Sequence, residues 1–452
     1  MAGPALDSSI FSPLFSDAEV SEQFSDAQFV RAMLEVESAL ATVQGRLGVI
    51  TAEAADQIVD AASRLEADFE RLRIGVEKSG VPVIDLVRQL REQVGGQAAD
   101  YVHWGATSQD IVDTARGLQI RAALTTFESR LGSLIQNLAQ LADKHRHTLM
   151  AGRTHSQQAL PITFGFKVAG WLAPLLRHRE RLAEMKPRVL VVQFGGGVGT
   201  LAALGESGIK VQEALAEELK LHLPLIPWHT QRDNMAELAG WLSMLSGSLA
   251  KMAQDVILLA QSEVGELHES DDASRGGSSS MPQKHNPIVS ELIITAARTN
   301  ASLLGSMHQA QVQEHERGTH GWQMEWLALP QMFTLTATAL NKALLLNQNL
   351  VVDEARMREN IAASNGLMLA EALSYALAKT SMSKASANQL VKEACLVVVK
   401  ENRHLVDVVQ EKTDVSVDWK ALREESAYLG SSDIFINRVL QAVTDGQEGT
   451  VE

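Results

Sequence analysis

Bulky apolar residues recur every three or four positions along much of the chain, which is the spacing of one face of an α-helix. The clearest run consists of Leu238, Leu242, Leu245, Leu249, Met252, Val256 and Leu259. Small residues form a second stripe roughly 200° around the same helix, namely Ala236, Gly240, Ser243, Gly247 and Ala250. The pattern predicts a helix of about seven turns that is enclosed on two sides, with solvent exposure of the small face as the alternative.

Other segments share this periodicity, and the proline positions favour long helices there. Residues 115–148 continue the spacing of three and four. Proline removes a helical hydrogen bond and clashes with the preceding turn, so proline-free stretches permit long helices. The eleven prolines leave three such stretches, 83–160, 228–281 and 331–452. Further helices are predicted over 162–186, with a kink at Pro174, and after Pro287, with Asn286 as the N-cap.

The two ends of the chain have shorter helical patterns than its centre, and only residues 189–228 have the character of strands. We therefore predict an all-α protein with three helical domains. These are an N-terminal domain over 1–112, a central long-helix bundle over 113–353 and a C-terminal domain over 354–452. Helices enclosed on two faces also predict that several copies of the chain associate.

Composition and charge exclude several classes of function. The 452 residues include 40 Lys and Arg against 55 Asp and Glu, which gives a formal charge of −15. Nucleic acids and anionic membranes require a basic surface, so neither is an expected partner. The single cysteine, Cys395, excludes an intrachain disulfide and a cysteine metal cage. Without an apolar run of ~20 residues or a secretory signal pattern, the sequence predicts a cytoplasmic protein.

Familiar cofactor motifs do not match this sequence. Residues 195–200 are glycine-rich, but they lack the Lys-Ser/Thr of a P-loop and do not fit GxGxxG, so nucleotide binding there is disfavoured. His315 and His320 are five positions apart, which does not place them on one face of a helix. We expect neither a metal ion nor another cofactor.

Polar segments interrupt the apolar pattern next to the predicted long helices. The most informative is 274–287, where glycines and serines precede Lys284, so that backbone amides and the lysine suit an anion. A flexible linker in solvent is the alternative for this segment. The other polar segments are 103–110, 152–157 and 313–317. Four polar clusters at the ends of successive long helices favour a functional site over independent helix caps.

These segments resemble the sequence blocks of the fumarase/aspartase superfamily. GSSSMPQKHNP, at 277–287, is similar to the signature GSSxMPxKxNP, and HWGATSQD and GRTHSQ are similar to the other two blocks in the same order. The resemblance covers essentially the whole chain. It implies a homotetramer around a twenty-helix bundle, in which each active site takes its three blocks from three different subunits.

The resemblance also implies roles for individual residues. Ser278 corresponds to the catalytic serine that moves a proton at the carbon next to a substrate carboxylate, and His155 corresponds to the histidine that acts as an acid toward the leaving group. The implied substrate-binding residues are His103, Thr107, Ser108, Arg153, Thr154, Gln231, Ser279, Lys284, Asn286 and Arg317. A structural ion pair remains the alternative for Arg153, Arg232 and Arg317.

Two further segments bear on the branch of the superfamily. Gln231-Arg-Asp and His315-Glu-Arg317 resemble the adenylosuccinate lyase branch, but Trp326 stands where that branch has an arginine for the nucleotide phosphate, and tryptophan cannot replace a cation. HERGTHGWQMEWLALP and HWGATSQDIVDT instead resemble the 3-carboxy-cis,cis-muconate cycloisomerase branch of the β-ketoadipate pathway. This resemblance implies that a small tricarboxylate is cyclised by adding its own carboxylate across a double bond. The alternatives are an adenylosuccinate-type lyase on another succinyl or fumarate-releasing substrate, and a catalytically silent homologue.

Overall fold

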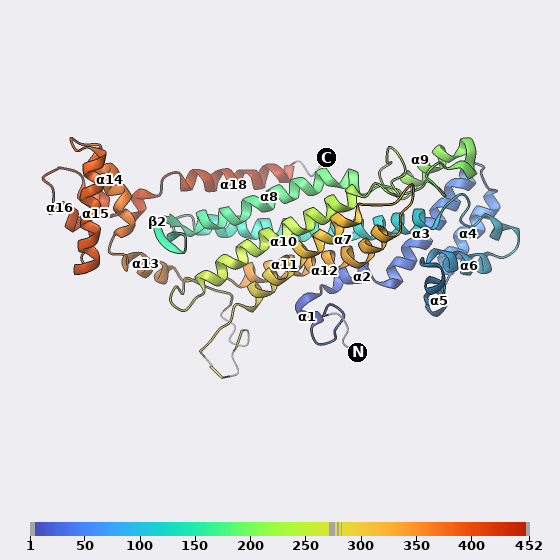
Figure 1. The fold of residues 1–452 in the computed structure, drawn as a ribbon, viewed down its shortest axis with the longest axis horizontal. Helices are drawn as coiled ribbons and strands as arrows, with labels where there is room; N and C mark the ends of the chain where they lie inside the picture. The colour runs from blue at the N-terminus through green and yellow to red at the C-terminus, as the bar shows by residue number, and fades with distance from the viewer. Residues whose placement is uncertain (1–4, 271–275, 278–279, 282, 449–452) are drawn as a thin grey trace. The chain divides into compact units, whose positions relative to one another are not determined.

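Helices dominate the computed structural model, which describes residues 5–270, 276–277, 280–281 and 283–448. The long helices are α7 (Ser108–Lys144), α8 (Phe164–Val189), α10 (Asp233–Leu259), α11 (Ile288–Ala310) and α12 (His320–Asn349) (Figure 1). The positions of α7, α8, α10 and α11 agree with the predicted long helices, whereas α12 continues through Pro330, where the proline pattern predicts a break. The predicted all-α fold class is confirmed.

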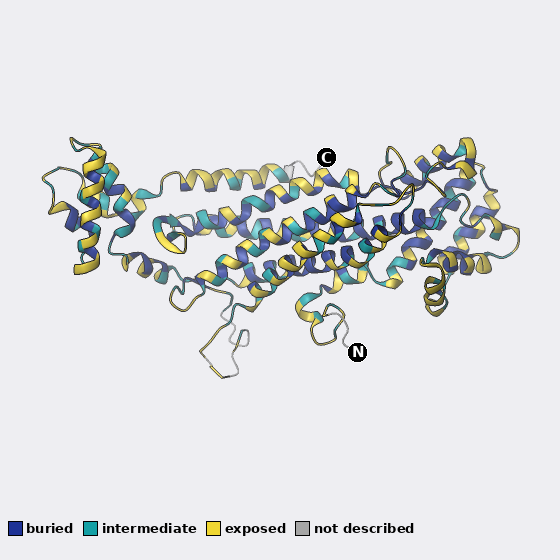
Figure 2. Cartoon of the chain, in the orientation of Figure 1, coloured by how far each residue is buried: buried dark blue, intermediate teal, exposed yellow. Residues whose placement is uncertain are grey.

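The bulky apolar stripe predicted on α10 lies in the core. Its seven residues, from Leu238 to Leu259, are each at most 4% exposed (Figure 2). Burial of apolar surface contributes about 25 cal/mol per Å², so this face holds the helix in place. The small stripe is less covered, since Gly240 and Ser243 are half-buried, Gly247 is exposed, and a methyl group added at either glycine would meet open space. Enclosure of this second face remains a prediction about association between copies of the chain.

Shorter helices precede α7 and follow α12. Before α7 lie α1 (Ser12–Phe15), α2 (Ala18–Gln23), α3 (Asp26–Arg46), α4 (Ala52–Arg64), α5 (Phe69–Ser79), α6 (Val83–Val94) and the 3₁₀ helix η1 (Gln97–Tyr101). The side chains of Asp17, Ser25 and Thr51 accept hydrogen bonds from the first turns of α2, α3 and α4. These residue types start helices because they satisfy amide groups that have no partner within the helix.

The C-terminal helices have an apolar core of their own. They are α13 (Glu354–Ala362), η3 (Leu367–Leu369), α14 (Ala370–Ala378), α15 (Lys384–Glu401), α16 (Leu405–Gln410), α17 (Trp419–Arg423), η4 (Glu425–Tyr428) and α18 (Ser432–Glu448). Leu373, Val391 and Val409 are among the buried residues that pack α14, α15 and α16 together. Between α8 and α10 lie η2 (Ala202–Ser207) and α9 (Gly208–Glu218).

The strand prediction for residues 189–228 is wrong. Within that segment the structure has only an isolated bridge between Val191 and His222. The apolar run is extended and buried, and at this bridge Leu190 and Val192 bond the backbone of His222. The groups that follow bond side chains: the Oγ1 of Thr114 bonds both backbone groups of Gln193, and the indole of Trp228 donates to the carbonyl of Val192. Burial of an extended segment therefore produced a strand-like pattern without a sheet.

Strands occur instead around the second polar block. β1 (Leu149–Thr154) and β2 (Gln157–Thr163) form an antiparallel hairpin, and β3 (Leu267–His268) pairs with β4 (Val351–Val352). This hairpin is not predicted from the sequence, because Pro161 lies inside β2 and the turn residues His155 and Ser156 are not typical of a tight turn.

The start of α11 differs from the predicted cap at Asn286. The backbone amides of Val289 and Ser290 donate to the carboxylate of Glu269, at 3.0 and 2.6 Å. A carboxylate is favourable at a helix N-terminus because it satisfies free amides and opposes the positive end of the helix dipole. Since Glu269 already occupies this position, the first turn of α11 is a weaker anion site than the sequence indicates.

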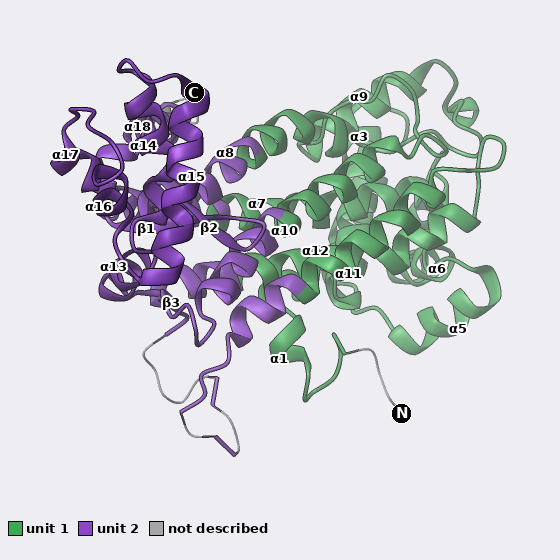
Figure 3. Cartoon of the chain, turned by 60° about the vertical axis from the view of Figure 1, so that its left-hand side comes forward, with its two compact units in different colours: residues 1–130, 178–247, 295–341 green, residues 131–177, 248–294, 342–452 purple. Residues whose placement is uncertain are grey.

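The chain divides into two compact units (Figure 3). Unit 1 consists of residues 1–130, 178–247 and 295–341, and unit 2 consists of residues 131–177, 248–294 and 342–452. Each long helix contributes residues to both units. Among the described residues, no single helix is long and apolar enough to cross a bilayer, although the bent pair 354–362 and 367–378 meets the length and composition criteria when taken together.

Candidate active site

One buried carboxylate organises the first polar block, residues 103–110, in unit 1. Asp110 lies in the first turn of α7 and is 0% exposed. The groups that meet it are the backbone amides of Thr107 (3.0 Å), Gly195 (3.0 Å) and Gly196 (2.9 Å), the Nε2 of Gln193 (3.2 Å) and the Nε2 of His229 (2.8 Å). A buried carboxylate is tolerated when such donors surround it. Asp110 thus fixes the loop before α7 against the glycine segment, whose first two amides are engaged in this contact rather than facing a phosphate.

Arg317 reaches the first block from the segment between α11 and α12. Its Nη1 donates to the Oγ1 of Thr107 at 2.6 Å and to the carbonyl of Gly197 at 3.5 Å, and its Nε donates to the Oε1 of Gln109 at 3.4 Å. Every described group that meets this guanidinium is therefore a neutral oxygen. Because no carboxylate of the described chain balances its charge, Arg317 is suited to an anionic ligand.

The other two candidate arginines are engaged in ion pairs. Arg232 is 3% exposed and binds both oxygens of Asp113, at 2.7 and 3.2 Å, and both oxygens of Glu325. Arg153 donates to both oxygens of the buried Glu266, at 2.9 and 2.6 Å. These contacts favour the structural alternative for Arg232 and Arg153, whereas those of Arg317 favour a ligand.

His103 is a further candidate cation in the first block. Its Nδ1 lies 2.6 Å from the Oε1 of Glu37, a residue of α3 that is 2% exposed. Burial lowers the pKa of His103, but the charge and the hydrogen bond of Glu37 outweigh burial, so the pKa is raised overall. His103 also has a φ of 63°, in the left-handed region that costs energy for a residue other than glycine. The loop therefore holds a charge-stabilised imidazole in a constrained conformation.

The second block forms the turn between β1 and β2 in unit 2. His155 and Ser156 have φ values of 51° and 61°, so both central residues of the turn are left-handed, a conformation usually provided by glycine or asparagine. Thr154 and His155 are exposed. Within the described part of the chain no group hydrogen-bonds the His155 ring, so the turn leaves this side chain exposed.

The signature loop is closed at its base by a backbone contact. Asn286 donates to the carbonyl of Gly276 through its backbone amide at 2.8 Å and through its Nδ2 at 3.0 Å. Gly276 has a φ of 69°, and a Cβ there would lie 2.5 Å from the backbone oxygen of Asn286, so the position requires glycine. Lys284 is exposed. Ser278 and Ser279 lie outside the described residues.

The structure brings some of the predicted site residues together and separates others into the two units. Unit 1 holds the Thr107–Arg317 contact and also His103, Ser108 and Gln231, of which Ser108 begins α7 and Gln231 is exposed just before α10. Unit 2 holds Arg153, Thr154, His155, Lys284 and Asn286.

Two residues of this arrangement were missed at the level of sequence. Asp110 lies three positions after Thr107 at a helix start, which is the spacing of a capping box and a usable signal. Glu37 interrupts the apolar face of α3 between Val36 and Leu40, which is also unusual for a helix packed in a core.

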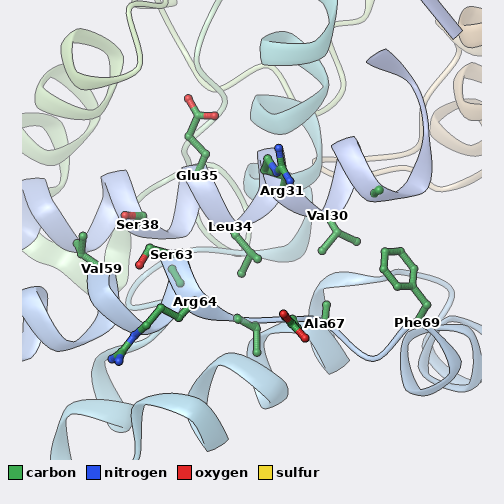
Figure 4. Close-up of a pocket in the computed structure, with 14 residues that line it drawn as sticks. Val30, Arg31, Leu34, Glu35, Ser38, Val59, Ser63, Arg64, Ala67 and Phe69 are labelled. Atoms are coloured by element: carbon green, nitrogen blue, oxygen red, sulfur yellow. The ribbon is translucent and has the colours of Figure 1, made fainter. Parts of the chain in front are cut away.

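A groove of about 900 Å³ between α3 and the end of α4 contains none of the predicted site residues (Figure 4). Val30, Leu34 and Ser38 line it from α3, at the spacing of one helix face. Glu37 is not among its lining residues, so the groove and the His103 contact lie on different faces of α3.

Comparison with known proteins identifies the family. A family model described as lyase matches residues 16–300. The chain belongs to this lyase family. It is 44% identical to 3-carboxy-cis,cis-muconate cycloisomerase of Pseudomonas aeruginosa over 95% of each chain. It is also 39% identical to trans-aconitate decarboxylase 1 of Mycosarcoma maydis, over 95% of this chain and 88% of that protein. The resemblance to the fumarase/aspartase superfamily is thereby confirmed.

A solved structure of this lyase family agrees with the fold. The 3-carboxy-cis,cis-muconate lactonizing enzyme of Pseudomonas putida matches with a TM-score of 0.90 and 40% identity, over 97% of this chain and 99% of that one. A match over 97% of this chain includes residues of both units.

Proposed function

We propose that the protein is a cycloisomerase that converts 3-carboxy-cis,cis-muconate into 4-carboxymuconolactone. The observation that carries this proposal is the 44% identity to the Pseudomonas aeruginosa cycloisomerase over nearly the whole of both chains. The contact between Thr107 and Arg317, which joins the two segments that resemble this branch, supports it. In this role the enzyme acts in the cytoplasm, in protocatechuate degradation through the β-ketoadipate pathway.

The reaction adds one carboxylate of the substrate across a double bond of the same molecule. The attacking carboxylate oxygen bonds to the carbon that bears the 3-carboxyl group, and a proton is added to the neighbouring carbon, which carries another carboxylate. The electron pair of the double bond is held on that carboxylate in an aci-carboxylate intermediate before the proton arrives. Fixed cations and amide donors stabilise this additional charge.

Because the nucleophile is a carboxylate, Ser278 and His155 have different roles. A free carboxylate has a pKa of about 4, so it is already ionised at neutral pH and needs no base to activate it. Ser278 delivers the proton to carbon in this direction, and its conjugate oxyanion is stabilised by neighbouring donors. His155 mainly binds and orients the substrate.

The remaining site residues hold a trianion. Arg317, Thr107 and His103 bind substrate carboxylates, together with Ser108 and Gln231 of the same unit. Lys284, Asn286, Ser279 and Thr154 contribute from the other two blocks. The exposure of His155 at its turn, with no described partner of its own, favours a site that is completed between subunits. We propose that this assembly is a homotetramer.

Replacing Arg317 with methionine is expected to raise KM for the trianion about 10–100-fold, because hydrogen bonds to a charged group contribute about 1.5–3 kcal/mol. The fold is expected to persist, since the partners that Arg317 leaves are neutral. The buried one, Gln109, keeps the hydrogen bonds that its Nε2 donates to Asp113 and to the carbonyl of His229. Arg31→Met, on the exposed side of α3 beside the groove, is the matched control and should leave KM unchanged. Equal KM values for Arg317→Met and wild type, measured from initial rates, would contradict the assignment.

The proposal is tested by offering the purified protein 3-carboxy-cis,cis-muconate and adenylosuccinate separately. Loss of the ultraviolet absorbance of 3-carboxy-cis,cis-muconate is expected, with no turnover of adenylosuccinate. Turnover of adenylosuccinate alone would support the lyase alternative, and no turnover of any substrate would support a silent homologue. Either result would refute the proposed function.

A second candidate function is decarboxylation of trans-aconitate. The observation that favours it is the 39% identity to the Mycosarcoma maydis decarboxylase over 95% of this chain. Both reactions require a pocket for a small unsaturated tricarboxylate, so Arg317 and His103 suit either one. Release of CO₂ from trans-aconitate, without consumption of 3-carboxy-cis,cis-muconate, would decide for this alternative.

A further inference from the structure

We infer that Glu37 is a positioning residue that holds His103 as an imidazolium, so that His103 becomes a carboxylate-binding cation of the active site. The inference rests on the proposed function only for the identity of the substrate. Glu37, a residue of α3, lies outside all four polar segments of the sequence. The inference also assigns His103 a charge state that the motif by itself does not specify.

Glu37 is a buried carboxylate, 2% exposed. Its side chain is within a helix face formed by Met33, Val36 and Leu40, which are each at most 1% exposed. A carboxylate in such surroundings is costly unless a cation or several donors meet it. In the described structure the group that meets it is the Nδ1 of His103 at 2.6 Å. The burial of Glu37 is therefore explained when His103 carries the proton and the positive charge.

α3 contacts the loop before α7 at two adjacent residues, His103 and Trp104. Gln44, which is 1% exposed, donates through its Nε2 to the carbonyl of Trp104 at 2.8 Å. Residues 37 and 44 are two helical turns apart and lie on one face of α3. Together these contacts impose the left-handed conformation of His103, whose φ is 63°. The helix therefore sets both the position and the charge of the imidazole.

The charges around His103 come from three helices. Glu37 on α3 and Asp110 on α7 raise its pKa, while burial and Arg91 on α6 lower it, and the balance is a raised pKa. With its Nδ1–H directed to Glu37, the ring has its Nε2–H left to donate to a ligand. Within the described residues no group occupies that nitrogen. An imidazolium in this loop adds a second charged donor to Arg317, which contacts Thr107 of the same loop, and a substrate with three carboxylates requires several such donors.

The test compares Glu37→Gln with Glu35→Gln, an exposed glutamate of the same helix. The probe is propane-1,2,3-tricarboxylate, whose affinity is measured by titration calorimetry on the full-length protein at pH 6 and pH 8, in parallel with KM for 3-carboxy-cis,cis-muconate. We expect Glu37→Gln to weaken binding about tenfold at pH 8, because the ligand then loses a charge-assisted hydrogen bond from the imidazolium. As the pH falls toward 6 a larger fraction of the imidazole in the variant becomes protonated, so the defect should shrink relative to pH 8. Glu35→Gln should match wild type at both pH values.

The pH dependence separates this role from a merely structural one. A misplaced loop would weaken binding equally at both pH values, and that result, or wild-type affinity at pH 8, would overturn the inference. If Glu37→Gln does not fold, the same titration is made with wild type and His103→Gln. The affinity of wild type for the tricarboxylate should fall as the pH rises through the raised pKa of His103. The affinity of His103→Gln should not change over this range. Because calorimetry does not need turnover, failure of the proposed function would appear separately, as binding without conversion of the muconate.

Discussion

Ser278→Ala is expected to lower kcat for the lactonisation by about 10²–10⁴-fold, the range that one proton-transferring group contributes. The reason is that the proton must be placed on carbon, which is slow without a positioned donor. His155→Asn should lower kcat by about tenfold or less, because the attacking carboxylate is already ionised and the histidine serves mainly to orient the substrate. The measurement is kcat at saturating substrate for both variants.

The matched control lies in the same loop. Ser280 occupies the variable position of GSSxMPxKxNP, so Ser280→Ala should retain most of the wild-type kcat. A His155 variant as inactive as Ser278→Ala would show that both residues transfer protons, and would contradict the division of roles proposed for them.

Arg232→Met is expected to cost the largest amount of stability, about 3–5 kcal/mol, because it leaves two buried carboxylates without their cation. The side chain binds Asp113 and Glu325 and lies over the ring of Trp228 at 4.6 Å. Its charged form is strongly favoured there, since the neighbouring carboxylates raise its pKa despite burial. We expect a clear drop in melting temperature.

Arg46→Met is the control for this stability prediction. Arg46 also pairs with a glutamate, Glu218 at 3.4 Å, but its side chain is 53% exposed. An exposed ion pair contributes about 0–1 kcal/mol, so the melting temperature should hardly move. Adding Asp113→Leu and Glu325→Leu to Arg232→Met should recover stability, because uncompensated charge is then removed. Equal melting temperatures for Arg232→Met and Arg46→Met would contradict the assignment of a buried ion network.

The long helices could be predicted from sequence because apolar residues spaced three and four positions apart lie on the helix face that packs in the core. That relation holds for α10, whose bulky stripe is buried. It failed for residues 189–228, where Thr114 and Trp228 supply hydrogen bonds that a strand would take from a neighbour. The spacing of apolar residues indicates which positions are buried. It does not indicate which groups form hydrogen bonds with the backbone amides and carbonyls.

The signature motifs indicated most of the candidate site residues, but they did not indicate the residues that hold those side chains and loops in place. Glu37 and His103 are 66 residues apart in sequence and meet only because α3 packs against the loop before α7. The same applies to Asp110, which binds amides of a glycine segment more than 80 residues away. Contacts of this kind depend on tertiary structure, so a motif can indicate the ligand-facing residue without its partner.

The acidic composition and an anionic substrate are compatible in this arrangement. The formal charge of −15 describes the whole chain, whereas Arg317 and His103 place positive charge at one loop. Local charge within a cleft, and not the net charge, governs the binding of a small ion.

The most direct test of the central claim is the product formed from 3-carboxy-cis,cis-muconate in D₂O, analysed by proton NMR and mass spectrometry. The account predicts 4-carboxymuconolactone that contains one deuterium on the carbon next to a carboxylate, with all substrate carbons retained. Fumarate, CO₂, or a lactone without deuterium at that carbon would contradict it.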